Sequence, residues 1–386
     1  MNKSGTRVLL IAYDLKFSGG SEGGAGASAL RAHSWLGNQV TLLTQSTTNL
    51  AELDNQFGEV EVHGIKVSRI LERICLKIPF SEQLRYIAWN FSAHKKLREL
   101  IQQNNFDYIH HATYSGDWNP CQALWVKEVK VVWGPVGGAQ QIPLRHLLKL
   151  GPRGLMKQLL YLLITTQLRK FNRWLAWRNR ITVLAVNKVS EKFFKERCET
   201  KMMNQISFES GAFAITKKKE RISDSTNVNI VGIGRLIPLK FWNVLIAAMA
   251  YLPHNYRLAI IGDGIEMNRL KRQVLKQNLG ERVQLLGEFS YGRTLEQIYN
   301  SDIVAFPSMK DSSPWVIAES LSLGTPVIAF DVCGVRELVS NSYPLVKIDG
   351  NIVKNFAEAI HKFEINRVDY NFCSCKLAYE YSKIFT

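Results

Sequence analysis

The amino-acid sequence predicts an α/β protein of two domains, each built on a parallel sheet with helices on both faces. In both halves of the chain, short apolar segments alternate with helix-length stretches, an alternation that is typical of parallel sheets. The alternation is interrupted by residues 213–227, which are polar, basic and without periodicity, and we place the linker there. The chain has 386 residues, 46% of them hydrophobic, which is enough for two cores.

In the first half, we expect strands at the apolar segments and helices between them. The segment EVEVHGIKVSRI is interpreted as a hairpin, and a Gly-rich turn is expected before the first helix. The strands are expected at 7–13, 39–44, 107–111, 129–135 and 181–187, and the helices at 27–36, 81–103 and between 111 and 129. This half, 1–215, forms the first domain.

The second half repeats the pattern more regularly and predicts a second doubly wound domain, 226–360. Its strand candidates lie at 228–234, 256–264, 282–289, 301–308 and 325–331. The tail, 361–386, is expected to form a closing helix. Its apolar residues at helical spacing are Phe372, Leu377, Tyr381, Ile384 and Phe385.

The net charge of +16 predicts an anionic partner. Nine Lys and Arg residues lie between residues 145 and 180, a stretch without acids in which Leu and Trp are interleaved. Two interpretations remain open: a basic amphipathic helix that lies on anionic lipid headgroups, or a solvated helix whose Leu face packs on the protein. Nucleic acid is not expected as a partner, because no RNA- or DNA-binding signature accompanies the charge.

The sequence also favours a cytoplasmic location. No apolar run approaches the roughly 18 residues that cross a bilayer. The apolar run near the N-terminus is too short for a signal peptide. The six cysteines include no CxxC pair, which favours a reducing compartment over structural zinc or disulfides. We therefore expect a cytoplasmic protein associated peripherally with the inner face of the cytoplasmic membrane.

Two carboxylates accompany a predicted helix in residues 310–330, a segment that ends in PWVIAESLSLGTPVIAF. Ser313 is a suitable N-cap and Pro314 suits the first helical position, so the helix is expected over 314–323. Asp311 then lies before the helix and Glu319 about a turn and a half inside it. A helix N-terminus attracts anions, and the acids can accept hydrogen bonds from hydroxyls, as a sugar nucleotide would require. The alternative is a structural helix whose acid pairs with an arginine.

A pair of cations follows the first strand of the second half, in GIGRLIPLK. Arg235 and Lys240 lie in the loop after Gly234, where a strand ends and a helix begins. Cations at this position suit a polyphosphate, since Arg binds it bidentately and Lys adds a point charge. The alternative is two solvated surface cations. Neither this segment nor GDGIEM, which contains Gly262, has the third glycine of a dinucleotide fingerprint, so nicotinamide binding is disfavoured.

Together these motifs resemble the nucleotide-binding half of retaining GT-B glycosyltransferases, the group 1 or family 4 class. GIGRLIPLK, AIIGDG, VQLLGEF, SDIVAFPS and, from Asp311 onwards, SSPWVIAESLSLGTPVIAFDVCGVRELV occur in the order and at about the spacing of that family. The resemblance implies a GT-B fold, with two facing Rossmann-like domains and an interdomain cleft. It implies that Asp311 contacts the donor sugar, that Glu319 binds the ribose, and that Arg235 and Lys240 hold the diphosphate.

The resemblance extends to further residues of both domains. In the second half it implies donor contacts from Gly234, Gly262, Ser312, Ser313 and Trp315. In the first half, GGSEGGAGAS resembles the family's Gly-rich loop and supplies Gly20 and Ser21, and WGPVGGAQQIP resembles a motif of one bacterial subgroup. His110 or His111, at a strand end, is implied beside the reacting sugar.

The chain departs from the family pattern at three positions. Asp311 stands where Glu is usual, Phe241 where Gly commonly follows the lysine, and Ala112 where a second His of an HxH motif is frequent. Two aspartates separated by one residue occur nowhere in the chain, so the metal clamp of the other major transferase fold is missing. We therefore expect no metal and no cofactor, with the cations and the helix N-terminus in the metal's place.

The resemblance implies a retaining transfer from a UDP- or GDP-sugar to a glycan acceptor. The acceptor is expected to be undecaprenyl-linked, in the assembly of a bacterial surface polysaccharide such as O-antigen or capsule. Two alternatives remain open. A sugar-nucleotide epimerase of the same fold has the same diphosphate chemistry, and a catalytically inactive scaffold could occupy a membrane-bound assembly complex.

Overall fold

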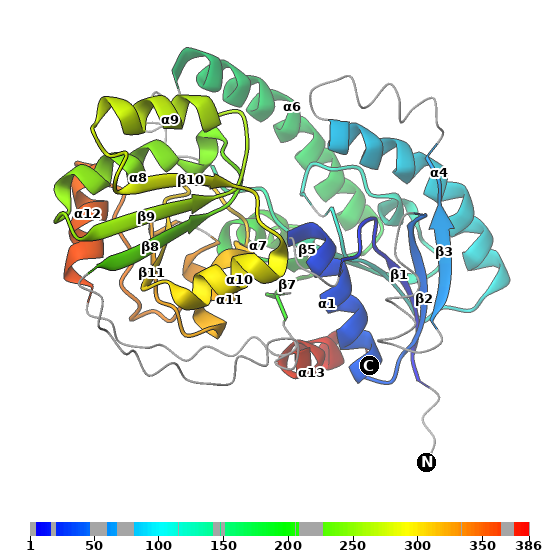
Figure 1. The fold of residues 1–386 in the computed structure, drawn as a ribbon. Helices are drawn as coiled ribbons and strands as arrows, with labels where there is room; N and C mark the ends of the chain where they lie inside the picture. Colours follow the sequence, from blue (N-terminus) through cyan, green and yellow to red (C-terminus); the bar gives the residue numbers. More distant parts are fainter. Residues whose placement is uncertain are drawn as a thin grey trace. The chain divides into compact units, whose positions relative to one another are not determined.

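A parallel sheet forms the centre of each half of the chain (Figure 1). The computed structural model describes residues 5–16, 21–46, 60–67, 81–114, 116–141, 147, 151–204, 206–207, 227–332, 334–363 and 374–385. Two compact units contain the sheets. Unit 1 comprises Met1–Ala139, Leu159–Glu209 and Cys373–Thr386, and unit 2 comprises Gln140–Gln158 and Ser210–Phe372. Most of the expected linker, 213–227, lies outside the described residues.

In the described part of unit 1, seven parallel strands follow the order β3-β2-β1-β4-β5-β6-β7. The strands are β1 (Arg7–Ile11), β2 (Gln39–Gln45), β3 (Glu61–Ile65), β4 (Tyr108–His111), β5 (Lys130–Val136), β6 (Thr182–Ala185) and β7 (Thr200–Met202). Along β1, Leu9 and Ile11 pack into one core and Leu10 into another, on the opposite face. A strand between two layers must be apolar on both faces, which explains its continuous apolar run.

The helical segments of unit 1 surround this sheet. They are α1 (Ser21–Trp35), α4 (Ser81–Gln103), η1 (Gln122–Trp125), α6 (Gly151–Arg178), α7 (Lys188–Lys195) and α13 (Ser374–Phe385). The first turn of α7 is capped by Asn187, whose side chain accepts a hydrogen bond from the backbone N–H of Ser190 at 2.9 Å. The first residues of α6 belong to unit 2 and the remainder to unit 1.

The described strands of unit 2 are also all parallel, in the order β10-β9-β8-β11-β12. They are β8 (Val228–Ile233), β9 (Tyr256–Ile261), β10 (Val283–Gly287), β11 (Ile303–Phe306) and β12 (Val327–Ala329). The helical segments are η3 (Pro238–Lys240), α8 (Trp242–Ala248), η4 (Met249–Tyr251), α9 (Met267–Lys276), α10 (Tyr291–Asn300), α11 (Trp315–Ser322), η5 (Arg336–Leu338) and α12 (Ile352–Lys362). Figure 1 shows α8 and α9 on one face of this sheet and α10 and α11 on the other.

The strand order of unit 2 places its functional loops side by side. β8 pairs with β9 on one side and with β11 on the other. The strands that follow β8 in the chain are therefore added first on one side of it, as β9 and β10, and then on the other side, as β11 and β12. Ligands of open α/β sheets bind at such a switch point, beyond the carboxyl ends of the strands. The loops after β8 and β11 therefore form the natural binding position of this unit.

The structure confirms the two predicted parallel sheets and corrects several local predictions. All five strands expected in the second half are present. The hairpin expected at 59–70 is wrong for the described residues, because Glu61–Ile65 form one continuous strand, β3, which pairs parallel with β2. Between β4 and β5, the described residues contain only the short turn η1 instead of a helix, in a stretch interrupted by Gly116 and Pro120. The sequence patterns did not predict α7 and β7.

The first helix begins earlier than the sequence suggested. α1 starts at Ser21 instead of Ala27, so most of the expected Gly-rich loop is helical. The small residues are needed because this end of α1 packs closely on the chain that leaves β1. A Cβ atom at Gly26 would lie 2.7 Å from the carbonyl oxygen of Asp14. The backbone N–H of Lys16 also donates to Gly23 O at 3.1 Å.

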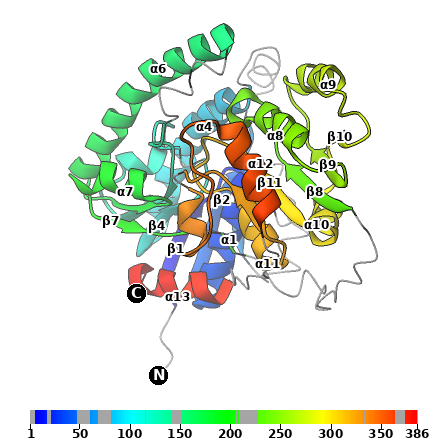
Figure 2. The ribbon, with the colours of Figure 1, turned by 90° about the vertical axis from the view of Figure 1, so that its left-hand side faces the viewer.

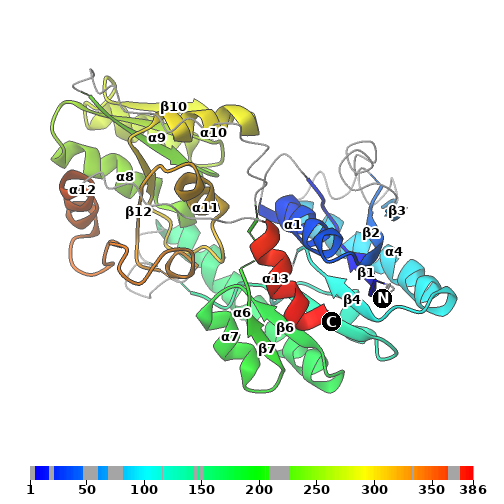
Figure 3. The ribbon, with the colours of Figure 1, turned by 90° about the horizontal axis from the view of Figure 1, so that it is seen from below.

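A closing helix was expected over 361–386, and α13 spans Ser374–Phe385 and packs within unit 1, whereas Phe372 lies outside the described residues. Figure 3 shows α13 beside α1, and its Leu377, Tyr381 and Phe385 are buried in the core on that face of the sheet. The ring of Phe385 lies 4.6 Å from the ring of His33 on α1. The end of the chain thus completes the core of its first half.

The long helix α6 runs past α7 and β7 (Figure 2). Its Leu face is not packed on the protein, since Leu159, Leu163 and Ile164 are more than half exposed. The alternative of a Leu face buried against the protein is therefore wrong for these residues. In the described part of the chain, no helix combines the length and the apolar content that crossing a bilayer requires.

Replacement of Phe385 by alanine tests the closing role of α13. The ring is fully buried, so its loss is expected to lower the free energy of unfolding by about 3–5 kcal/mol. Tyr379, on the same helix and 64% exposed, provides the control, and Tyr379→Ala is expected to change stability by about 0.5 kcal/mol or less. Chemical denaturation measures both. Equal effects of the two substitutions would contradict the packing of α13.

Candidate active site

The centre of the candidate site is an ion pair between the two loops at the switch point of unit 2. Lys240 follows β8 at the end of η3, and Asp311 lies between β11 and α11. The Lys240 Nζ donates to Asp311 Oδ2 at 2.5 Å, with both side chains largely buried. The ammonium group also lies 4.9 Å from the centre of the ring of Phe306, the last residue of β11. The structure thus brings together a cation and an acid that are far apart in the sequence.

Arg235 has a fixed backbone and an exposed side chain. Its carbonyl oxygen accepts a hydrogen bond from the Trp242 Nε1 at 2.9 Å, whereas the residue is exposed to solvent. No carboxylate among the described residues forms an ion pair with its guanidinium group. The predicted cation pair is therefore divided: Lys240 is held by Asp311, and Arg235 is available to an anion.

Backbone conformations around these loops leave no room for side chains. Gly262 has φ +137°, and a Cβ atom there would lie 2.1 Å from the carbonyl oxygen of Gly234. Gly334 has φ +93°, and a Cβ atom there would lie 2.2 Å from the carbonyl oxygen of Asp311. Phe241 adopts the left-handed conformation, with φ 53°, which explains why glycine suits this position. Its buried ring fills the core of unit 2.

Glu319 is buried in α11, with 7% of its surface exposed. The Tyr291 hydroxyl, at the start of α10, donates to Glu319 Oε1 at 3.0 Å. Burial raises the pKa of Glu319 to about 7, and the hydrogen bond from Tyr291 opposes this shift. The alternative of an arginine partner for this acid is wrong, because Tyr291 occupies that position. A carboxyl group with a pKa near physiological pH can both accept and donate hydrogen bonds.

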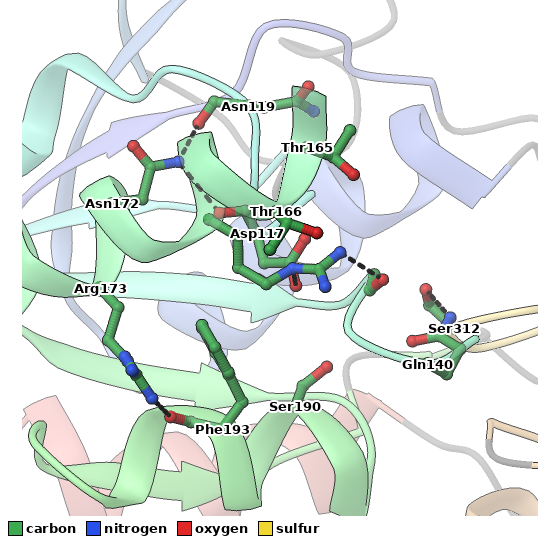
Figure 4. A network of polar contacts seen from close by, with 12 residues as sticks. Asp117, Asn119, Gln140, Thr165, Thr166, Asn172, Arg173, Ser190, Phe193 and Ser312 are labelled. Carbon is green, nitrogen blue, oxygen red and sulfur yellow. Dashed lines mark hydrogen bonds and ion pairs between the residues drawn. The ribbon is translucent and has the colours of Figure 1, made fainter. Parts of the chain in front are cut away.

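The first turn of α11 differs slightly from its prediction. The helix begins at Trp315, and Pro314 is the N-cap, with no side-chain capping bond. Ser313 therefore precedes the cap. The Ser312 Oγ accepts a hydrogen bond from the Gln140 Nε2 at 2.5 Å (Figure 4). Gln140 is the first residue of unit 2 and lies in the WGPVGGAQQIP motif, so this motif contacts the loop that carries Asp311.

A buried polar network in unit 1 supports the residues just before Gln140 (Figure 4). The Arg169 Nε on α6 lies 2.6 Å from Asp117 Oδ2, with the two side chains 6% and 0% exposed. Arg169 also donates through Nη2 to Gly138 O at 3.0 Å. Asn172, further along α6, donates to the carbonyl oxygens of Asp117 and Asn119. Two polar side chains of α6 thus hold the glycine-containing segment and the loop beside it.

The two candidate histidines point to opposite faces of the unit 1 sheet. His110 lies between His33 Nε2, 3.0 Å from its Nδ1, and Gly134 O, 3.0 Å from its Nε2. The Nε2 of His111 instead lies 3.2 Å from the Tyr86 hydroxyl. Burial lowers the pKa of His110 to about 3 and that of His111 to about 4. Both imidazoles are therefore neutral at physiological pH, and both nitrogens of His110 have protein partners.

The remaining predicted site residues lie in the Gly-rich segment of unit 1. Gly20 lies outside the described residues. Ser21 is the first residue of α1, and only its backbone is described. A helix thus begins at the carboxyl end of β1, which is where anion-binding helices begin in open α/β sheets.

Sequence reasoning missed three polar residues of these sites. Tyr291 begins a helix, and only its hydroxyl near a buried acid reveals its role. Gln140 belongs to a motif of interest but carries no signal of its own. His33 is far from His110 in the sequence, and neither residue type nor spacing indicates their contact. Among the described residues, no three His, Cys, Asp or Glu side chains gather in a group that could hold a metal ion.

Two Rossmann-like domains with parallel sheets, one of them with cations and acids at its switch point, define the GT-B class. The structure matches that of Anabaena HepE in complex with UDP-glucose with a TM-score of 0.60 over 98% of both chains, at 16% identity, so the fold is shared. Residues 214–375 match the family of group 1 glycosyl transferases. The matched segment covers most of unit 2.

The chain is also similar to characterised and uncharacterised relatives. An uncharacterized glycosyltransferase of Methanocaldococcus jannaschii is 22% identical over 81% of this chain and 83% of its own length. A UDP-Gal:α-D-GlcNAc-diphosphoundecaprenol α-1,3-galactosyltransferase of Escherichia coli is 30% identical over 43% of this chain and 45% of its own length. In several other curated relatives the matched segment covers a smaller share of the relative's length, down to 15%.

The pKa of Glu319 predicts a specific pH dependence of stability. Because the pKa is raised from 4.5 to about 7 on folding, the unfolded chain loses this proton first as the pH rises. The free energy of unfolding therefore falls between these two pH values, by about 3 kcal/mol from this group. Glu319→Gln keeps an acceptor for Tyr291 but cannot ionise, so its free energy of unfolding is not expected to show this decrease. Urea denaturation from about pH 5 to about pH 8 measures the free energy of unfolding of both proteins. If this free energy depended on pH in the same way in the wild type and in the variant, the assignment would be contradicted.

The Arg169–Asp117 pair predicts a large effect of a small substitution. Asp117→Asn leaves a buried guanidinium group without its counter-charge and is expected to cost about 3–5 kcal/mol of stability. Glu196→Gln is the matched control, because it removes the partner of Arg173 on the same helix at an exposed position. That control is expected to cost less than about 1 kcal/mol. Similar losses in thermal denaturation would argue against a buried pair.

Proposed function

We propose that the chain transfers a sugar from a UDP- or GDP-sugar to a hydroxyl of a glycan acceptor, with retention of the anomeric configuration. The observation that carries the proposal is the Lys240–Asp311 pair at the switch point, with the exposed Arg235 on the same loop as Lys240. An exposed arginine on the same loop as an ion-paired lysine fits a ligand with both a diphosphate and sugar hydroxyls. The match of residues 214–375 to the group 1 family supports the same chemistry.

The donor diphosphate would bind between Arg235 and Lys240. Lys240 uses one of its three N–H donors on Asp311, so the others can bind phosphate oxygens. Arg235 adds a two-pronged donor, and the N-terminus of α11 adds a partial positive charge. All three stabilise the negative charge that develops on the diphosphate as the bond to the sugar breaks.

The hydroxyl groups of the donor would be bound by the two acids. Lys240 contacts one oxygen of Asp311, so the other can accept a hydrogen bond from the donor sugar. Glu319, oriented by Tyr291, is proposed to bind the ribose hydroxyls. The close backbones at Gly234 and Gly262, with Ser312, Ser313 and Trp315 before and at the start of α11, would line the remainder of the donor site.

The proposed reaction needs no separate base. The bond between the sugar and the diphosphate breaks, and the acceptor hydroxyl attacks from the face that the diphosphate leaves. Its proton passes to the leaving phosphate oxygen. We assign no proton transfer to His110, because both of its nitrogens have protein partners. A role for His111 beside the reacting sugar stays a prediction, as do the roles of Gly20 and Ser21.

The acceptor is proposed to be an undecaprenyl-linked glycan of a surface polysaccharide. One relative is named for such an acceptor, and the outward apolar face of α6 supports work at a membrane. We place the enzyme in the cytoplasm, at the inner face of the cytoplasmic membrane. With Arg235, Lys240 and the α11 N-terminus at the diphosphate, we propose that turnover requires no metal.

The donor reaction is tested by following UDP or GDP release from a panel of sugar nucleotides in the presence of EDTA. The wild type is expected to turn over at least one donor. Arg235→Ala and Glu319→Ala are expected to lose about tenfold to 1000-fold, because each removes a contact to the charged or hydroxyl-bearing part of the donor. Arg272→Ala on α9 is the control and is expected to match the wild type.

Equal turnover in all four proteins would contradict the site assignment. Abolition of turnover by EDTA would contradict metal independence. Conversion of the donor into a different sugar nucleotide without acceptor would identify an epimerase, since a transferase only hydrolyses its donor slowly under that condition. If calorimetry detected no binding of any UDP or GDP ligand, an inactive scaffold would be the better interpretation.

A further inference from the structure

The middle of α6 exposes apolar side chains and buries polar ones, although its last turns bury Leu175 and Ala176. The side chains that it buries include Thr165, Arg169 and Asn172, each 5% exposed or less. Apart from its tryptophans, it carries six apolar side chains that are between 40% and 68% exposed: Leu159, Leu160, Leu163, Ile164, Leu168 and Phe171. We call these six residues the α6 stripe. Soluble helices bury their apolar face, so a stripe of this kind marks a surface that something apolar covers.

The α6 stripe continues through two tryptophans into a cationic cavity. Trp174 and Trp177, 37% and 50% exposed, follow Phe171 at helical spacing. The guanidinium group of Arg178 lies 5.2 Å from the centre of the Trp174 ring. Beyond them is a cavity of about 560 Å³, whose lining includes Trp177, Arg178, Arg180 and Arg197. Apolar side chains, then tryptophans, then cations is the order in which a protein meets lipid tails, the interface and headgroups.

The arginines of this cavity are not neutralised by carboxylates of the described chain. Arg169 and Arg173 on the same helix are both ion-paired, with Asp117 and Glu196. In contrast, no carboxylate among the described residues pairs with any arginine of the cavity lining. The one acid in the lining, Glu199, instead accepts from the Thr182 hydroxyl at 3.1 Å and lies 3.7 Å from Lys201.

The cavity is separate from the candidate donor site. Arg180 lies just before β6 and Glu199 just before β7, so the cavity is at the amino ends of these strands. The binding positions of a parallel sheet are at the opposite, carboxyl ends. Loss of the cavity's charge should therefore leave donor chemistry unchanged.

We propose that Arg178, Arg180 and Arg197 bind the phosphate group of an anionic phospholipid, while the α6 stripe lies in the apolar boundary of the same membrane surface. The inference rests on the membrane location in the proposed function and names the ligand that would hold the enzyme there. Charge complementarity favours this occupant over a second protein, because an apolar partner helix would cover the stripe but would leave three arginines uncompensated. Arginine suits the task because its planar group binds two phosphate oxygens at once.

Vesicle co-sedimentation separates the parts of this proposal. The cavity variant is R178Q/R197Q, and the stripe variant is L163S/I164S. The matched control is R272Q/K276Q, which removes the same charge from α9, at a second cavity lined by Arg272 and Lys276. Each protein is mixed with vesicles of phosphatidylcholine alone or with phosphatidylglycerol added. Circular dichroism verifies that each variant is folded, and the donor assay verifies that the cavity variant reacts as the wild type does.

The wild type is expected to prefer the vesicles with phosphatidylglycerol. The cavity variant is expected to bind them about 30-fold more weakly and to lose the preference, since each of its two missing cations contributes roughly 5-fold at an anionic surface. The stripe variant is expected to lose binding to both kinds of vesicle. The control is expected to behave as the wild type does.

Four results would overturn the inference. If the cavity variant and the control lost affinity equally, only overall charge would matter. If the stripe variant alone lost binding, the membrane location would stand and the cavity would not be a lipid site. If inorganic phosphate bound the wild type in a calorimetric titration while both kinds of vesicle bound it equally, the cavity would be a site for free phosphate. If the wild type bound neither kind of vesicle, both the membrane location and this inference would be wrong. The proposed donor reaction would be unaffected, because the turnover assay tests it independently.

Discussion

The candidate site depends on the strand order of unit 2. Because β8 pairs with β11, the loops that follow these two strands lie side by side. The Lys240–Asp311 ion pair links the two loops. Tight backbone contacts at Gly262 and Gly334 hold the same loops from either side. Without this strand order, the lysine and the aspartate would have no reason to meet.

The buried acid of α11 follows from the same arrangement. Glu319 is the one charged residue type in α11, and its hydrogen-bond partner is the Tyr291 hydroxyl rather than a cation. Its pKa rises to about 7, with one hydrogen bond from Tyr291. A group in this condition destabilises the fold whenever it is ionised. Such a cost is typical of residues kept for binding, and the ribose of a sugar nucleotide offers the hydroxyls that would offset it.

Much of the fold could be predicted from the sequence, because parallel strands between helix layers need continuous apolar runs. The five strands of unit 2 were predicted in this way. The segment that forms β3 was misread as a hairpin, since residue pattern does not reveal the direction of a strand's partner. The predicted first helix was too short because its glycines suggested a loop, whereas they allow a close approach to the Asp14 carbonyl.

The residues of the candidate site could be selected from the sequence only where a motif preserves their order. Arg235, Lys240, Asp311 and Glu319 were selected in this way, and the structure brings Lys240 and Asp311 into contact. Tyr291, Gln140 and His33 could not be selected, because their partners are distant in sequence. The burial of polar side chains and the exposure of apolar ones along the middle of α6 could not be predicted from the sequence either. The cationic count of residues 145–180 suggested a membrane face, but Arg169 and Arg173 serve ion pairs within the protein, and the outward stripe is apolar.

The most direct test of the donor site is calorimetric titration of UDP and GDP into the wild type and into Lys240→Gln. The account predicts that one nucleotide binds the wild type and that the substitution weakens binding by about tenfold to 150-fold, as loss of a charged hydrogen bond does. Lys276→Gln on α9 should bind as the wild type does. Equal nucleotide affinity in all three proteins would contradict a diphosphate site at the switch point.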